Sequence, residues 1–236
     1  MSQGIAQLKK MSTEQRLTIQ LVQGCHGDPE DFNKLVQKSE QALLQAQVIG
    51  IEISWRPLNK QVELSSLEYI FADYPGRQSF QKAQLLWLNE HNKIILPCEY
   101  PTDYQSELSD CVTQLTQLCW RETQAQNNRT ATILYGAYQT IRQWIFLAQL
   151  GYWLHHLETK KLITNEPLTV PIMTGTHRAL ETKLKNCYSI PTERYFVPND
   201  DLGQGGLDEN YYDLFEAMTT HARVTQTQLK NPLSLS

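Results

Sequence analysis

Apolar and polar residues alternate along Leu17–Gln23, with a period of two that is typical of a half-buried β-strand. Asp28 and Pro29 follow a short turn, and this pair is well suited to cap and open a helix. Apolar residues then recur at helical spacing to about Val48, and a second alternating stretch covers Ile49–Trp55. The pattern therefore predicts a β-α-β unit as the first part of the fold.

The pattern after this unit predicts first a hairpin and then helices. Gln84–Leu88 and Lys93–Leu96 flank the polar stretch Asn89–Asn92, which favours a β-hairpin with a four-residue turn. Beyond residue 102 the apolar period becomes helical, and the longest helix is predicted over about Thr130–Leu157. The expected fold class is α+β: an N-terminal β-α-β plus β-hairpin sheet packed against a C-terminal helical subdomain.

These elements suggest four segments along the chain. Residues 1–14 are expected to be a flexible N-terminal arm, and residues 15–100 an α/β sheet subdomain. Residues 101–229 are expected to form a helical subdomain, followed by a polar tail over 230–236. Within the helical part, Pro167 and Pro171 indicate a connection, His177–Cys187 a short helix, and residues 208–229 a final helix.

Composition narrows the class of protein. The chain has 236 residues and a formal net charge of −4, which argues against a protein that mainly binds nucleic-acid backbone. Its five cysteines include no CxxC pair, and the N-terminus has no apolar signal region, so we expect a reducing, cytoplasmic location. The most apolar stretch, Ile133–Leu157, is interrupted by polar residues, so we expect no membrane span.

Cys25 and His26 are the first candidates for chemistry. They lie between the first predicted strand and the start of the following helix. A helix N-terminus and an adjacent imidazole both favour the thiolate form of cysteine, which is the nucleophilic form. Neighbouring residues rarely face each other well enough for proton transfer, however, and the acidic residues that follow oppose a bound anion. An ordinary loop is the simpler interpretation of this segment.

His155 and Glu158 form the second candidate pair, near the end of the long predicted helix. A spacing of three places them on one helical face, as two metal ligands would be. A di-metal bundle needs matching motifs on two helices, and the sequence contains none. A histidine near a helix C-terminus is also favourable without any ligand. We therefore assign no catalytic residue beyond these candidates, and we predict no metal site and no cofactor.

Basic residues between positions 151 and 198 form the third candidate site. They are interleaved with aromatic residues, a composition that suits single-stranded nucleic acid. The same composition fits a solvated rim around an aromatic core. The nucleic-acid-binding candidates are Lys160, Lys161, Arg178, Lys183, Lys185 and Arg194.

Three functional hypotheses follow. The leading one is a non-catalytic cytoplasmic accessory or assembly subunit that acts through protein–protein contacts, because catalytic motifs are missing and glutamine-rich faces suit such contacts. The first alternative is a nucleic-acid-associated subunit of a ribonucleoprotein complex. The second alternative is a small-ligand-binding protein or enzyme with a pocket between sheet and helices. A protein partner is thus expected, while nucleic acid is a less favoured partner.

Overall fold

The structure is a computed structural model that describes residues 2–24, 29–58, 63–71, 75–99, 114–174 (except 116, 120 and 123) and 178–196. The chain divides into two compact units. Unit 1 consists of residues 1–103 and 143–201, and unit 2 of residues 104–142 and 202–236. Each unit is described by itself below.

Unit 1 is built on a five-stranded parallel sheet. The strands lie in the order β5 (Ile94–Pro97), β2 (Val48–Ile51), β6 (Leu168–Thr174), β1 (Leu17–Gln23) and β7 (Thr192–Phe196). All neighbouring pairs in this sheet run parallel. The β-α-β opening of the chain is confirmed, but β6 separates its two strands in the sheet.

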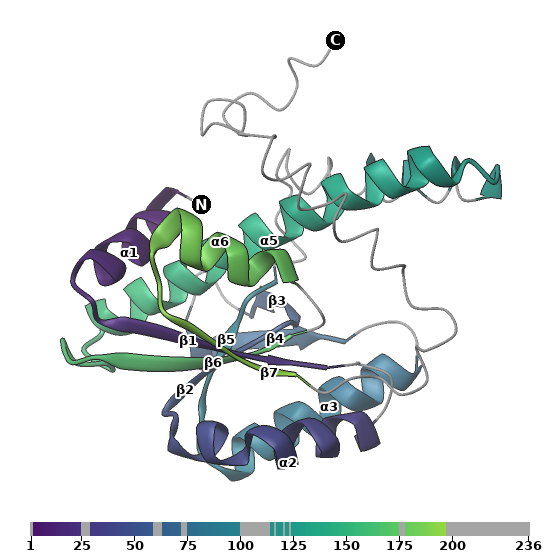
Figure 1. The fold of residues 1–236 in the computed structure, drawn as a ribbon. Coiled ribbons are helices and arrows are strands. Elements are labelled where there is room, and N and C mark those ends of the chain that lie inside the picture. Colours follow the sequence, from purple (N-terminus) through teal and green to yellow (C-terminus); the bar gives the residue numbers. More distant parts are fainter. Residues whose placement is uncertain are drawn as a thin grey trace. The chain divides into compact units, whose positions relative to one another are not determined.

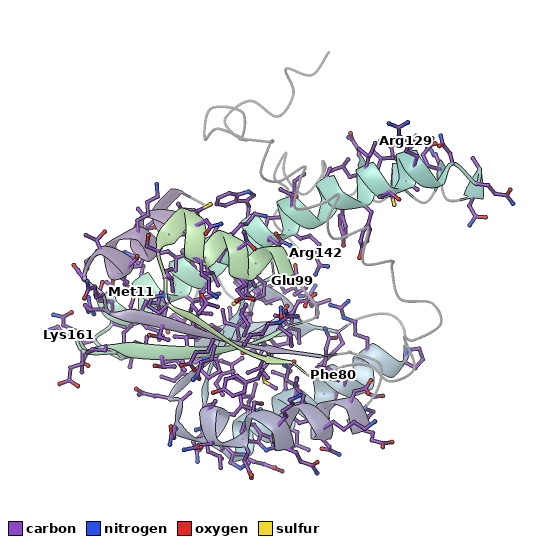
Figure 2. All side chains as sticks on the ribbon, viewed as in Figure 1. Met11, Phe80, Glu99, Arg129, Arg142 and Lys161 are labelled. Atoms are coloured by element: carbon purple, nitrogen blue, oxygen red, sulfur yellow. The ribbon has the colours of Figure 1, made fainter. Side chains whose placement is uncertain are left out.

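Helices cover both faces of this sheet (Figure 1). Helices α2 (Pro29–Gln45) and α3 (Pro75–Glu90) lie on one face, where Phe32 and Phe80 pack in the core. Helices α1 (Ser2–Thr13) and α6 (Arg178–Tyr188), with residues 143–159 of α5 (Asn128–Thr159), cover the other face. Figure 2 shows Met11 and Phe80 on these opposite faces. The mixed α and β class is therefore confirmed.

The expected flexible arm over residues 1–14 is wrong, because residues 2–13 form helix α1. Leu8 and Met11, three residues apart, are fully buried in the core. The helix crosses α5 very closely at two glycines. A Cβ on Gly4 would overlap the carbonyl of Ala148, and a Cβ on Gly151 would overlap the carbonyl of Gly4. Only glycine at both positions permits this approach.

The hairpin predicted over Gln84–Leu96 is also wrong. Residues 75–90 form helix α3, and β5 pairs in parallel with β2 instead of antiparallel with a neighbouring strand. The buried side of α3 includes two glutamines, Gln81 and Gln84, so apolar residues alone do not reveal its period. Among the described residues, antiparallel pairing occurs in a separate two-stranded sheet of β3 (Ser54–Pro57) and β4 (Leu67–Ile70). A 3₁₀ turn at Leu64–Ser66 lies between these strands and directly precedes β4.

Two strands lie in the part of the chain that was expected to be helical. The predicted connection between Pro167 and Pro171 is strand β6, whose Val170, Ile172 and Met173 are fully buried. Strand β7 follows the predicted short helix, which is confirmed as α6. The sheet therefore draws its strands from both halves of the chain.

Unit 2 is described only in part. It contains the first half of α5, where the rings of Tyr135 and Tyr138 lie 6.0 Å apart and the Arg142 guanidinium lies over the Tyr138 ring. The Cys119 thiol donates a hydrogen bond to the carbonyl of Ala131. The helix predicted over 208–229 and the tail over 230–236 lie outside the described residues.

Candidate ligand site at the carboxyl edge of the sheet

The order of the strands creates a topological switch point in unit 1. Strands β1 and β6 are neighbours, with Gln23 at the end of β1 opposite Thr174 at the end of β6. The chain leaves β1 toward α2 on one face of the sheet, whereas it leaves β6 toward α6 on the other face (Figure 1). In open α/β sheets, ligands bind outside the carboxyl ends of strands at such a point.

Buried polar side chains gather at this edge of the sheet. We call Gln23, Glu52, Arg77, Gln81 and Thr174 the Glu52 cluster. Gln23 and Thr174 are fully buried, while Glu52 and Gln81 are each 3% exposed. Burying polar groups costs free energy unless they are hydrogen-bonded, so a polar cluster in an otherwise apolar core needs a specific reason.

Glu52 is the centre of the cluster and directly follows β2. Its Oε2 accepts a hydrogen bond of 2.8 Å from the Thr174 hydroxyl, and its Oε1 accepts one of 3.0 Å from Arg77 Nη2. Its backbone carbonyl lies 3.5 Å from the donor Gln81 Nε2. These bonds join the ends of β2 and β6 to the first half of α3. They hold the carboxylate in one orientation at the switch point.

Arg77 is the member of the cluster that reaches solvent. It lies in the first turn of α3, and 27% of its side chain is exposed, compared with 4% for Glu52. Its Nε is buried and has no hydrogen-bond acceptor among the described residues. The guanidinium therefore connects the buried carboxylate to the surface.

Cys98 and Glu99 directly follow strand β5 and lie beside this cluster. The Cys98 thiol is fully buried and donates to the carbonyl of Leu96. Burial raises the thiol pKa well above its usual value, and the nearby carboxylates of Glu99 and Glu52 raise it further. Glu99 is 7% exposed, and its carbonyl accepts a hydrogen bond from the Trp55 indole. Cys98 is thus a protonated, unreactive core residue, while the two carboxylates give this edge an acidic character.

The residues proposed from sequence lie elsewhere or outside the described part of the chain. Cys25 and His26 fall outside the described residues. Glu158 lies near the end of α5, where it accepts hydrogen bonds from Gln7, Lys10 and Arg16. His155 Nε2 lies 3.5 Å from the Thr159 hydroxyl instead. The described contacts therefore place Glu158 in an ion-pair network and do not bring it together with His155.

The basic candidates that the structure describes lie on several different elements of unit 1. Lys160 and Lys161 are exposed and precede β6, at the amino edge of the sheet; Figure 2 shows Lys161 there. Lys183 is only 7% exposed and donates to Gln143 Oε1 at 2.6 Å. Lys185 is exposed and pairs with Glu181.

The last two of these basic residues lie on separate elements of unit 1. Arg178 begins α6, and its side chain lies outside the described set. Arg194 lies in edge strand β7 opposite Leu21. Nucleic-acid binding by these side chains stays a prediction.

The structure identifies functional candidates that the sequence patterns did not single out. Glu52 occupies a polar position of an alternating strand pattern, which is normally interpreted as facing solvent. Its place directly after β2 is the signal that could have identified it, but the predicted strand extends to Trp55 and includes it. Arg77 and Thr174 lie 25 and 122 residues further along the chain, so no local motif connects them with Glu52.

A metal site and a membrane-spanning helix would each be recognisable among the described residues. No three or more histidine, cysteine or acidic side chains come together there in a group that could hold a metal ion. Among the helices that the structure describes, none combines the length and apolar character needed to cross a membrane.

Comparison of the chain with protein-family models, with curated protein sequences and with solved structures finds no match to any of them.

Proposed function

We propose that unit 1 binds a small polar ligand at the Glu52 cluster, as a binding protein or an enzyme. The observation that carries this proposal is the hydrogen-bonded set of Glu52, Thr174 and Arg77 at the carboxyl ends of β2 and β6. A buried ion pair contributes little net stability, because the cost of removing two charges from water offsets their attraction. A binding role gives such a pair a reason to lie at the switch point.

This proposal follows the small-ligand hypothesis drawn from the sequence, with different residues. The residues proposed to bind the ligand are now Glu52, Arg77 and Thr174 instead of Cys25, His26, His155 and Glu158. The accessory-subunit hypothesis, its cytoplasmic location and the nucleic-acid hypothesis stay predictions. A ligand-binding subunit of a larger complex would satisfy the first of these as well.

A ligand screen with matched variants tests the proposal. The full chain is screened by thermal shift against mononucleotides, sugar phosphates, amino acids and dicarboxylates, and each hit is measured by calorimetry. Glu52→Gln removes the charge with little change in shape, and Glu68→Gln is the control, since Glu68 lies 40% exposed on the small sheet. We expect binding to weaken at least about tenfold in Glu52→Gln, which corresponds to about 1.4 kcal/mol, and to be unchanged in Glu68→Gln.

Hydrogen exchange locates the bound ligand without relying on a variant that folds well. We expect the hit to slow amide exchange at the ends of β1, β2 and β6, near residues 23–24, 52–53 and 174. Protection confined to other elements would contradict the proposal. So would equal affinities of the wild type and Glu52→Gln in a variant with a normal unfolding transition.

A further inference from the structure

Arg77 has hydrogen-bonding capacity that the described residues leave unused. A guanidinium carries five N–H donors in a planar fork. Contacts among the described residues account for one of them, an N–H of Nη2 that donates to Glu52 Oε1. The buried Nε has no acceptor among these residues. Buried donors are nearly always paired in native proteins, so an unpaired one needs an explanation.

We propose that Arg77 binds an oxyanionic group of the ligand, a carboxylate or a phosphate, through guanidinium N–H groups that Glu52 does not engage. This inference rests on the proposed function, since it names the ligand chemistry of the same site. Glu52 acts as the positioning residue: its carboxylate fixes one nitrogen of the guanidinium. A planar fork held in this way presents its remaining donors to two oxygens at once, which is the geometry of carboxylate and phosphate recognition.

The charges in the first turns of α2 and α3 favour binding of the oxyanionic group beside α3. The first turn of α3 contains no acidic residue, whereas the first turn of α2 contains Glu30 and Asp31. The positive end of the α3 macrodipole adds to the attraction of Arg77 for an anion. The carboxylates of Glu52 and Glu99 oppose a second negative charge, so the same edge suits a ligand that also offers hydroxyl or amine donors.

Titration of the wild-type protein with inorganic phosphate, and separately with succinate, tests this inference directly. The Nε–H signal of Arg77 is observable in a proton–nitrogen correlation spectrum and is assigned by its loss in Arg77→Lys. We expect one of the two anions to shift this signal saturably, while sodium chloride at equal ionic strength does not. A signal that neither anion moves overturns the inference.

Matched variants supply the second arm of the experiment. Arg77→Gln removes the fork, and Lys82→Gln removes a charge from an exposed position of the same helix. We expect affinity for the effective anion to fall at least tenfold in Arg77→Gln, to fall less in Arg77→Lys, and to stay within twofold in Lys82→Gln. Equal losses in Arg77→Gln and Lys82→Gln would show general charge attraction and overturn the inference.

Failure of the inference and failure of the proposed function give different results. If a ligand binds at the carboxyl edge and depends on Glu52, but is neutral or binds Arg77→Gln normally, only the inference on Arg77 is wrong. If no compound protects the carboxyl edge from exchange and neither anion moves the Arg77 signal, both are wrong.

Discussion

Glu158 connects the end of helix α5 to the N-terminal part of the chain. Its carboxylate accepts hydrogen bonds from Lys10 Nζ at 2.8 Å, Arg16 Nη1 at 2.9 Å and Gln7 Nε2 at 3.0 Å. The bond from Lys10, followed by those from Arg16 and Gln7, lowers the pKa of Glu158 from 4.5 to about 2, although partial burial opposes the shift. The network therefore stabilises the docking of α1 against α5.

The size of this effect follows from the pKa. A shift from 4.5 to about 2 corresponds at most to about 3 kcal/mol of folding free energy, at about 1.4 kcal/mol per pH unit. The Glu158 side chain is 16% exposed and that of Lys10 is 48% exposed, so solvent screens part of the attraction. We therefore expect Glu158→Gln to lower the free energy of unfolding by about 1–2 kcal/mol at pH 7.

The depressed pKa of Glu158 determines how its contribution to stability changes with pH. The folded pKa of Glu158 is depressed, so the stabilisation is fully present above the unfolded pKa of 4.5 and is lost as the pH falls toward about 2. The difference between wild type and Glu158→Gln is expected to shrink steadily below about pH 5 and to lose more than half of its size by about pH 3.

Urea denaturation at pH 7, 5, 4 and 3 measures this difference, with the exposed Glu166→Gln as the control. If Glu158→Gln were as stable as Glu166→Gln at pH 7, the network would contribute nothing. A difference that stayed constant down to pH 3 would show that the loss comes from packing and not from the charge.

Three further predictions concern residues of unit 1. Gly151→Ala places a methyl group against the Gly4 carbonyl and is expected to cost about 1–3 kcal/mol in urea denaturation, with faster amide exchange in α1; unchanged exchange would contradict the close crossing. Burial lowers the pKa of Lys183 to about 8, so folding binds fewer protons between pH 8 and 10.5, and stability rises with pH in that window. Lys183→Met is therefore expected to be about 1–2 kcal/mol more stable than wild type at pH 7, an advantage that disappears near pH 10.5 and that denaturation curves at both pH values measure. In peptide mapping after iodoacetamide treatment, Cys187, which is exposed, is expected to be labelled in the native protein, whereas buried Cys98 is expected to react only after unfolding.

The sequence patterns predicted those elements whose buried faces are apolar. Strand β1 and helix α2 show this, since Phe32, Leu35 and Leu43 mark the buried side of α2 at regular helical spacing. The pattern predicts a hairpin in place of helix α3, because Gln81 and Gln84 lie on the buried side of this helix. Its apolar residues alone therefore do not show a helical period. Pro167 and Pro171 indicate a connection in the sequence, whereas Pro167 directly precedes β6 and Pro171 lies within this strand, inside the sheet.

The candidate site was harder to predict than the fold. An alternating strand pattern assigns Glu52 to a polar, solvent-facing side, but in a parallel sheet covered by helices on both faces that side is interior as well. Whether such a carboxylate is acceptable depends on partners that only the tertiary structure supplies. Those partners, Arg77 and Thr174, are polar residues that have no spacing relation to Glu52 in the sequence.

The position of β1 in the sheet has a consequence for how the protein folds. Both neighbours of β1 come late in the chain, since Leu17 pairs with Leu168 and Ile19 also pairs with Thr192. A sheet with such distant pairings closes slowly, because a long loop must be ordered before the contacts form. During synthesis, the apolar strand β1 would leave the ribosome long before either neighbour exists. The first hundred residues would therefore depend on chaperones or on transient non-native contacts until β6 and β7 emerge.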